Sequence, residues 1–173
     1  MAKIERKTWG YIIPTLLLIA GAFFLFYKSN VATGGFASGG YKSYGYFSHN
    51  GSGEDLDIKT IRWHQHKGYE RLVFDIYEWD GVFGENPYQR SNFTGVYQIG
   101  TEKKGTLFLD GEVSGYRAFS ADMPSFSKSK IIKKMEVYSN DDGSFLFSVK
   151  LKRAAAYKVF TLKNPARIII DIK

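Results

Sequence analysis

The chain has 173 residues, no cysteine and only three histidines. The absence of cysteine excludes disulfide bonds, thiolate metal ligands, a cysteine nucleophile and lipid attachment through cysteine. Any membrane anchor must therefore be made of polypeptide. The length leaves room for one ordinary domain and some additional sequence, because single cores usually occupy roughly 100–200 residues.

Concentrated positive charge is also lacking beyond the N-terminus, although the formal net charge is +7. Four of the basic residues and one acidic residue precede Ser29: Lys3, Arg6, Lys7 and Lys28, with Glu5. The rest of the chain keeps 20 basic and 16 acidic side chains, which alternate. A nucleic-acid-binding protein would cluster its basic residues on one face, so no nucleic-acid partner is expected.

Residues 9–27 form an uncharged run, WGYIIPTLLLIAGAFFLFY. At 1.5 Å per residue, a helix of this length crosses a hydrocarbon core of roughly 30 Å, so the run predicts a single transmembrane helix. Trp9, Tyr11 and Tyr27 lie at its two ends, where aromatic rings favour the headgroup layer. We interpret these three residues as membrane anchors.

A cleaved signal peptide is the competing interpretation of this segment, because it also begins with a basic stretch followed by an apolar one. The apolar run is longer than a signal peptide requires, and no small-x-small cleavage site follows it. The basic residues before the run predict a cytoplasmic tail at residues 1–8. In a bacterium the protein would then be a single-pass inner-membrane protein with its C-terminal domain in the periplasm.

Residues 28–53 are rich in Gly and Ser and predict a tether without a packed element. Its interleaved aromatic residues are unusual for a flexible linker: Phe36, Tyr41, Tyr44, Tyr46 and Phe47. Two interpretations remain open. The tether is either a strap lying on the membrane or on its own domain, or a segment that becomes ordered against a partner protein.

Residues 54–173 show strand patterns separated by turn signals, without a long amphipathic helix. Residues 58–64 and 71–77 flank Lys67-Gly68 and predict a hairpin. Residues 132–138 and 144–151 flank Asn140-Asp-Asp-Gly143, for which a hairpin turn is favoured over a calcium loop. Seven or so short strands of this kind predict an all-β sandwich.

The two ends of this region resemble the AMIN-like domain family. The opening IRWHQHKGYERLVFDI resembles the family's first hairpin, with matches at His66, Gly68, Tyr69, Glu70, Arg71, Val73, Phe74 and Asp75. The close YKVFTLKNPARIIIDI resembles its last hairpin, with matches at Tyr157, Leu162, Asn164, Pro165, Arg167 and Asp171. The intervening residues 80–125 depart from the pattern and are interpreted as inserted or rearranged.

The resemblance implies a non-catalytic β-sandwich of envelope proteins that contacts peptidoglycan or neighbouring proteins. We therefore expect a scaffold or structural subunit of a membrane-proximal periplasmic complex, such as a flagellar motor, pilus or secretion machine. A peptidoglycan-binding localisation module is the alternative. The candidate binding residues are His66, Tyr69, Arg71 and Arg167, although cross-strand ion pairs between the two arginines and Asp75 and Asp171 would be a structural explanation.

Enzymatic chemistry has little support in the sequence. His64 and His66 lie two residues apart on a predicted strand and would point the same way, as two zinc ligands do. No third ligand is evident, so a small metal-dependent hydrolase is the lesser hypothesis. No serine lies in a G-x-S-x-G elbow, and we expect no cofactor, no bound metal and no catalytic activity.

Overall fold

The computed structural model describes residues 40–79, 89–140 and 143–173. The predicted tail, transmembrane helix and anchor residues Trp9, Tyr11 and Tyr27 lie outside these ranges. Within them, no helix has the length and apolar character needed to cross a membrane. The described residues belong to one compact unit, residues 34–173.

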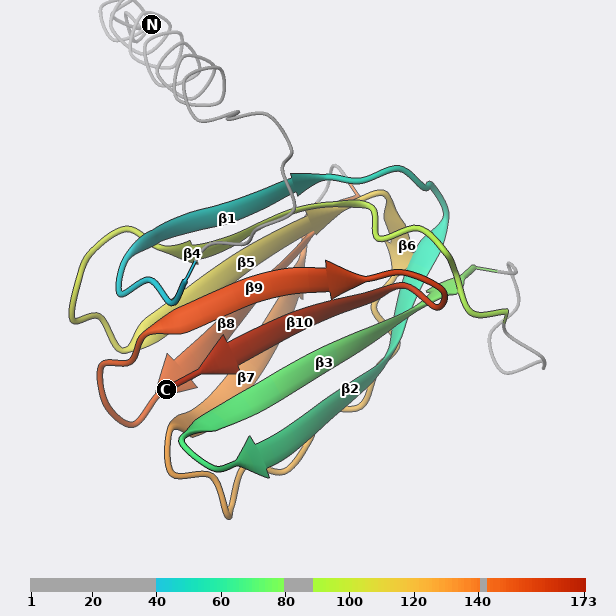
Figure 1. Ribbon diagram of the computed structural model, residues 1–173. Coiled ribbons are helices and arrows are strands. Elements are labelled where there is room, and N and C mark those ends of the chain that lie inside the picture. Colours follow the sequence, from blue (N-terminus) through green and yellow to red (C-terminus); the bar gives the residue numbers. More distant parts are fainter. Residues whose placement is uncertain (1–39, 80–88, 141–142) are drawn as a thin grey trace, which may run out of the picture. The chain divides into compact units, whose positions relative to one another are not determined.

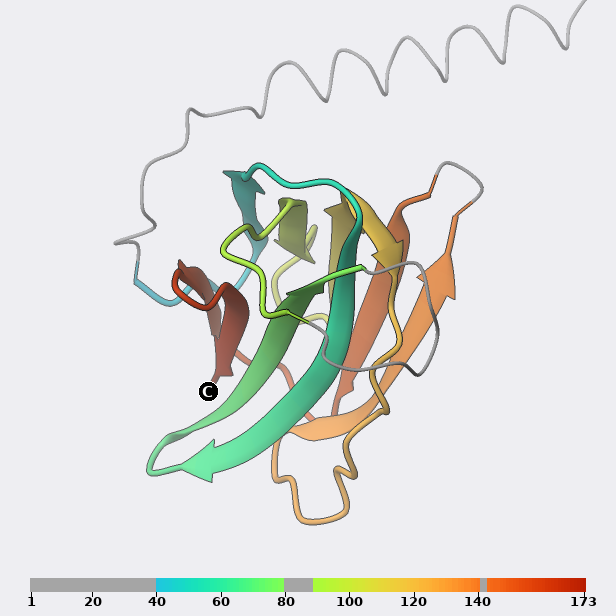
Figure 2. The same ribbon diagram turned by 90° about the vertical axis from the view of Figure 1, so that its right-hand side faces the viewer.

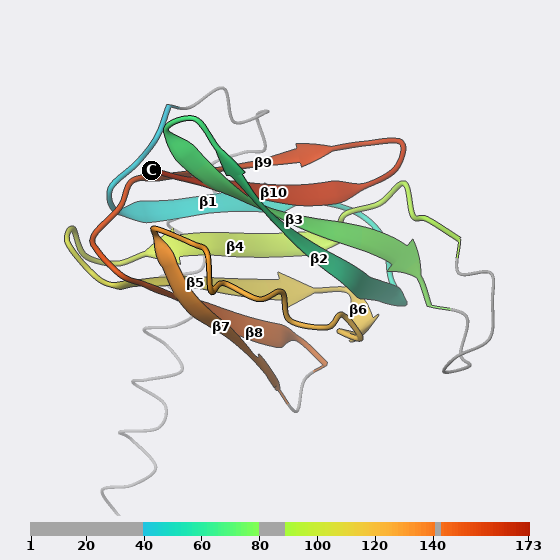
Figure 3. The ribbon, with the colours of Figure 1, turned by 90° about the horizontal axis from the view of Figure 1, so that it is seen from below.

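Two five-stranded sheets pack face to face, which confirms the predicted all-β two-layer fold (Figures 1 and 3). Sheet A has the order β6-β2-β3-β10-β9, and sheet B has the order β1-β4-β5-β8-β7. The strands of sheet A are β2 (Leu56–His66), β3 (Tyr69–Glu78), β6 (Tyr116–Ala118), β9 (Tyr157–Leu162) and β10 (Arg167–Ile172). The strands of sheet B are β1 (Gly45–Asn50), β4 (Val96–Thr101), β5 (Phe108–Ser114), β7 (Ile132–Ser139) and β8 (Phe145–Leu151).

The three hairpins expected from the sequence are present as antiparallel pairs β2–β3, β7–β8 and β9–β10. Gly68 in the first turn has a φ of 90°, a conformation that glycine adopts without steric cost. The long strands β2 and β3 curve along their length (Figure 2), and their register shifts between Ile58 and Thr60. Such a bulge bends a strand locally.

The stretch interpreted as inserted or rearranged, residues 80–125, contributes to both sheets. It forms β4 and β5 in the middle of sheet B and β6, which pairs in parallel with β2. The stretch is therefore integral to the sandwich. Alternating side chains of β4 and β5, such as Ile99, Leu109 and Val113, are fully buried in the core.

The predicted tether over residues 28–53 is wrong in its C-terminal part. Gly45–Asn50 form β1, which pairs antiparallel with β4 at the edge of sheet B. Just before it, Lys42 exchanges two backbone hydrogen bonds of 2.8 Å with Tyr157 at the start of β9 in sheet A. This segment thus pairs first with sheet A and then with sheet B. The Gly-rich composition concealed its strand, because Phe47 is the only buried residue of β1.

Tyr157 of sheet A links the two sheets at this end of the sandwich through contacts with β1 and β4 of sheet B. Its side chain is fully buried and packs edge-to-face on Phe47 at 5.9 Å between ring centroids. Its hydroxyl donates a hydrogen bond to the carbonyl of Gly45 and accepts one from the Thr101 amide. Burial raises the pKa of Tyr157 to about 12, so the hydroxyl remains protonated and keeps its donor at physiological pH.

Candidate functional site

The outer face of sheet A carries an ordered array of charged and aromatic side chains. Alternate residues of β2, β3, β10 and β9, such as Ile61, Phe74, Ile170 and Val159, fill the core. Their neighbours point outward because side chains alternate across a strand. We call these outward residues the arginine face: Arg62, His64, His66, Tyr69, Arg71, Val73, Asp75, Lys158, Phe160, Leu162, Arg167, Ile169 and Asp171.

The centre of the arginine face is apolar and covered. Val73 and Ile169 are paired in register, with Arg62 and Phe160 completing the row on either side. Although Val73 and Ile169 lie on the outer surface of sheet A, they are only 6% and 2% exposed. Long side chains of the flanking rows therefore cover them, as arginine stems commonly do.

The charged row on one side of this centre runs His64, Arg71, Asp171 and Lys158. Arg71 donates two hydrogen bonds to Asp171, from Nε at 2.6 Å and from Nη2 at 2.8 Å. Its guanidinium also lies 5.4 Å from the Tyr69 ring and 5.5 Å from the Phe160 ring. The hydrogen bond with Asp171 is the main cause of a raised pKa at Arg71, so the guanidinium stays charged.

The charged row on the other side contains Asp75 between two arginines. Arg62 donates to both carboxylate oxygens, from Nε at 2.7 Å and from Nη2 at 2.8 Å. Arg167 lies opposite Asp75 in register, but its Nε is 3.8 Å from the nearest carboxylate oxygen. That Nε is buried and has no hydrogen-bond partner. Arg167 is thus the incompletely paired cation of the arginine face.

His66 stacks on Tyr69 with 4.6 Å between ring centroids and an angle of 11° between the planes. Planar groups thus follow one another across the face: the His66 and Tyr69 rings, the Arg71 guanidinium and the Phe160 ring. His64 lies beside it, with 6.5 Å between the two imidazole centroids. Among the described residues, no group of three His, Asp or Glu side chains is arranged to hold a metal ion.

The segment before β1 also reaches this region. The Lys173 ammonium lies over the Tyr41 ring, 3.9 Å from the ring centroid, in a cation–π contact. The pKa of Tyr41 is raised by burial and by the negative charge of Asp171, and Arg71 opposes the shift. Tyr41 therefore lies within electrostatic range of the Arg71–Asp171 pair.

The arginine face brings together all four candidate binding residues, His66, Tyr69, Arg71 and Arg167. The predicted ion pairs are present, but the sequence interpretation treated them as surface pairs, whereas the side chains of Asp75 and Asp171 are only 4% and 8% exposed. Sequence reasoning also missed Arg62 and Phe160. The signal for Arg62 was its alternation with His64 and His66, which places it on the same outward face.

Replacing Arg71 with alanine is expected to lower the free energy of unfolding by about 2 kcal/mol. The loss arises because Asp171 would remain buried without its two hydrogen bonds. Lys158, opposite Asp171, limits the cost. Urea unfolding measures the effect, with Lys134→Ala as the control because the Lys134–Glu136 pair is exposed. Equal stabilities of the two variants would contradict the buried-pair description.

In a comparison with known protein families, a model of the AMIN-like domain matches residues 56–173. The match begins at β2 and covers the arginine face completely. No curated protein and no solved structure gives a significant match.

Proposed function

The chain belongs to the AMIN-like domain family, and from this premise we propose that it is a non-catalytic envelope protein whose sandwich docks onto partner subunits of a membrane-proximal periplasmic complex. Residues 9–27 anchor it in the inner membrane. The arginine face is the docking surface, and its partner carries a carboxylate group. The family membership supports the assignment to envelope binding modules.

The observation that carries this proposal is the excess of cations on the arginine face. Three guanidinium groups, Arg62, Arg71 and Arg167, stand against two carboxylates, Asp75 and Asp171. Both oxygens of each carboxylate already accept hydrogen bonds from Arg62 or Arg71. The Arg167 side chain is 30% exposed, so its guanidinium can donate to an external carboxylate, a group that planar guanidinium groups suit.

The length of the connecting segment supports a position near the membrane. The described part of the domain begins at residue 40, and residues 28–39 connect it to the proposed transmembrane helix. Twelve residues span at most about 40 Å when fully extended. The start of the domain at residue 40 would therefore lie within about 40 Å of the membrane.

Peptidoglycan is the second candidate ligand, since its stem peptides also present carboxylates to such a face. The family match supports this candidate as well. The aromatic side chains Tyr69 and Phe160, which frame Arg71, would add apolar contact with either ligand. The two candidates predict different binding results. A partner protein would co-purify with the chain from detergent-solubilised membranes, whereas peptidoglycan would bind the chain in isolated cell-wall sacculi.

Affinity purification of the full-length chain from solubilised membranes tests the proposal. We expect a reproducible set of envelope proteins with the wild type and about a tenfold lower recovery with Arg167→Gln, since hydrogen bonds to charged groups contribute about 1.5–3 kcal/mol. Lys104→Gln is the matched control, because it removes one positive charge from an exposed site on the β4–β5 turn.

Sedimentation with isolated cell-wall sacculi provides the second arm. If Arg167→Gln abolishes sedimentation while no proteins co-purify, peptidoglycan is the ligand and the scaffold proposal is wrong. Recovery of the chain alone, without binding to sacculi, would contradict both candidates. Stoichiometric zinc in the purified protein would instead support the hydrolase hypothesis for His64 and His66.

A further inference from the structure

Several connections between strands meet at the end of the sandwich where the described chain enters it, on the left of Figure 3. Lys42, just before β1, pairs with Tyr157 at the end of the β8–β9 connection. The β4–β5 turn lies at the same end, because Gly45 at the start of β1 pairs with Thr101 at the end of β4. We call this region the basic end: residues 40–44, 102–107 and 152–156, together with Lys173.

The basic end carries many more cations than carboxylates. Its exposed cations include Lys42, Lys103, Lys152, Arg153 and Lys173. Glu102 is the only acidic residue of residues 40–44, 102–107 and 152–156. Although basic and acidic residues alternate along the sequence, the fold therefore concentrates positive charge at this end.

The opposite end of the sandwich has no such excess among the described residues that form it. Glu54 and Asp55 lie on the β1–β2 connection, Arg117 lies in β6 and Lys163 lies on the β9–β10 turn. Asp55 accepts a hydrogen bond from Arg117 at 3.1 Å. The charge of the domain is thus polarised along its strands.

No carboxylate in the described part of the chain forms an ion pair with the basic end, because all the ion pairs there lie elsewhere. Lys42 donates to the Tyr46 carbonyl at 3.2 Å, and Lys152 donates to the Ser129 carbonyl at 2.5 Å. Lys173 lies over the Tyr41 ring. These contacts orient the ammonium groups but leave their charge uncompensated.

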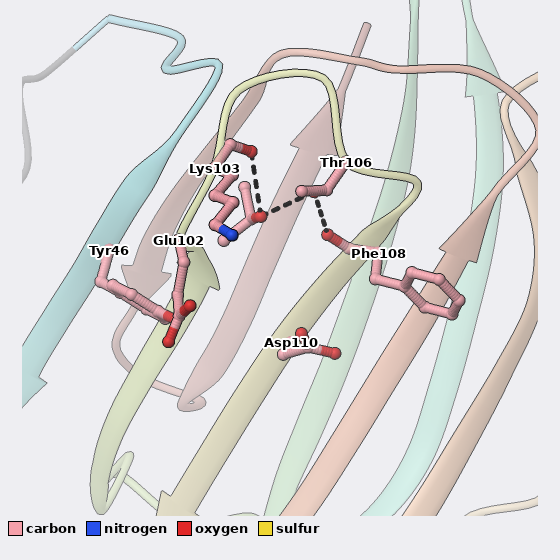
Figure 4. A pocket seen from close by; sticks show the side chains of 7 residues that line it. Tyr46, Glu102, Lys103, Thr106, Phe108 and Asp110 are labelled. Atoms are coloured by element: carbon pink, nitrogen blue, oxygen red, sulfur yellow. Dashed lines mark hydrogen bonds between the residues drawn. The ribbon is translucent and has the colours of Figure 1, made fainter.

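The β4–β5 turn presents its part of the basic end from an ordered frame (Figure 4). The Thr101 hydroxyl donates to the Lys103 carbonyl at 3.4 Å and shares a hydrogen bond of 2.7 Å with the Thr106 hydroxyl. Thr106 also donates to the Phe108 carbonyl at 3.0 Å. These hydrogen bonds close the turn, and the side chains of Lys103 and Leu107 are exposed on it.

Exposed apolar side chains accompany the cations. Tyr44 is 57% exposed, and Leu107 is 41% exposed. Surfaces that lie on membranes combine the same residue types, because aromatic and aliphatic side chains enter the headgroup layer while lysine and arginine attract anionic lipids. The basic end therefore has the chemistry of a membrane-contacting surface.

We propose that the basic end lies on the headgroup surface of the membrane and binds anionic phospholipids. This inference rests on the proposed anchor at residues 9–27 but not on the arginine face. Residues 28–39 span at most about 40 Å, so they hold the end at which the chain enters the domain near the headgroups. Each basic residue close to an anionic surface strengthens binding about fivefold.

Contact at the basic end would orient the domain for docking. β9 begins at Tyr157, beside Lys42, and ends at Leu162, so its direction leads away from the basic end. The strands would then stand away from the membrane. The arginine face, as the outer face of sheet A, would point sideways towards a neighbouring subunit.

The absence of cysteine allows one fluorophore to be attached at either end of the domain. Leu107→Cys labels the basic end and Leu162→Cys labels the far end of β9, and both leucines are 41% exposed. The labelled full-length chain is reconstituted into vesicles of phosphatidylcholine, or of phosphatidylcholine and phosphatidylglycerol in equal parts. A spin label on the lipid headgroups quenches a fluorophore that lies close to the membrane.

We expect quenching at position 107 to be at least about twofold greater in the anionic vesicles than in phosphatidylcholine alone. Position 162 should show no such increase. The difference at position 107 should disappear in about 1 M salt, where the Debye length falls to about 3 Å.

Charge variants identify the groups responsible. Lys103→Gln combined with Arg153→Gln should weaken docking about 25-fold, because two fivefold contributions are removed. Lys163→Gln combined with Arg117→Gln is the matched control, which removes the same two side-chain types from the opposite end. Both pairs are exposed, so the thermal midpoint should be preserved. Arg167→Gln should leave quenching unchanged, so failure of the arginine face as a docking surface would not affect this result.

Equal quenching at position 107 in the two kinds of vesicle, or equal losses in the two double variants, would overturn the proposal and leave an acidic protein as the occupant. Stronger quenching at position 162 than at position 107 would also overturn it. Flotation of the vesicles tests the anchor separately. A chain that floats only with anionic vesicles would support the basic end and contradict the anchor, whereas a chain that floats with neither would contradict both.

Discussion

Glu70→Ala is expected to lower the free energy of unfolding by about 3–5 kcal/mol, because it removes a buried, fully hydrogen-bonded carboxylate and leaves its partners unpaired. Glu70 is 2% exposed, and its carboxylate accepts four hydrogen bonds. The donors are the Trp63 indole, the Ser129 hydroxyl and the backbone amides of Lys130 and Ile131. This carboxylate fixes the segment before β7 to sheet A.

The same residue predicts how stability depends on pH. Burial raises the pKa of Glu70, but the hydrogen bonds from Ser129, Lys130, Trp63 and Ile131 outweigh it, and the net shift is downward. A lowered pKa in the folded state contributes stability that is present above the unfolded value of about 4.3 and is lost as pH falls through the folded value. Glu70→Gln should therefore flatten the acid limb of the stability curve.

Urea unfolding at pH 7 and at several values below pH 5 measures both effects. Glu136→Gln is the control, because this carboxylate is exposed and should produce no measurable change at neutral pH. A loss of stability in Glu70→Ala no larger than that of the control would contradict the hydrogen-bond network as described.

Gly111→Ala is expected to lower the free energy of unfolding by about 3 kcal/mol, at the upper end of the usual cost of overpacking. Gly111 faces the core from β5 and pairs with Phe147 of β8. A Cβ atom there would lie 2.1 Å from Cζ and 2.4 Å from Cε1 of the Phe147 ring. The ring cannot retreat freely, because Phe74 of the opposite sheet packs against it at 5.2 Å.

A double-mutant cycle identifies the cause of this loss. Phe147→Leu shortens the side chain, so Gly111→Ala should cost clearly less in that background than in the wild type. Gly40→Ala is the matched control, because a Cβ at Gly40 meets no atom within 4 Å. Additive losses in the cycle would show that the glycine acts through backbone conformation and not through contact with Phe147.

The sequence predicted the elements whose pattern is local. The hairpins β2–β3 and β9–β10 follow from alternating apolar residues around recognisable turns, and Phe147, Val149 and Leu151 are buried as their alternation indicates. The expected cross-strand ion pairs place Arg71 and Arg167 on outward positions, where His66 and Tyr69 also lie. The four residues meet on one face because β10 pairs with β3, a long-range contact that the local pattern does not reveal.

Other features depend on long-range pairing and could not be read from neighbours in sequence. β1 contains Gly45 and four polar or exposed positions, and its strand exists because β4 supplies hydrogen bonds across the sheet. Residues 80–125 were interpreted as inserted or rearranged because they depart from the family pattern. Gly95, Gly100, Gly105 and Gly111 interrupt the apolar alternation there. Three of these glycines, Gly95, Gly100 and Gly111, accommodate aromatic rings from other strands.

The burial of Asp75 and Asp171 was missed for a related reason. Charged residues alternating on a strand indicate a solvated face, and isolated surface pairs contribute little. On this face the arginine side chains and the rings of Tyr69 and Phe160 cover both the carboxylates and the apolar centre. That arrangement requires four strands from opposite ends of the domain, so residues 71 and 171 become neighbours only in the folded sheet.

Photo-crosslinking in living cells tests most directly whether the arginine face is the docking surface. A photoreactive phenylalanine analogue replaces Leu162, which is 41% exposed in the row of Arg167, or Leu146, which is 37% exposed on the outer face of sheet B. We predict discrete protein adducts from position 162 that disappear with Arg167→Gln, and none from position 146. Adducts from position 146 alone, or adducts from position 162 that persist with Arg167→Gln, would contradict the assignment.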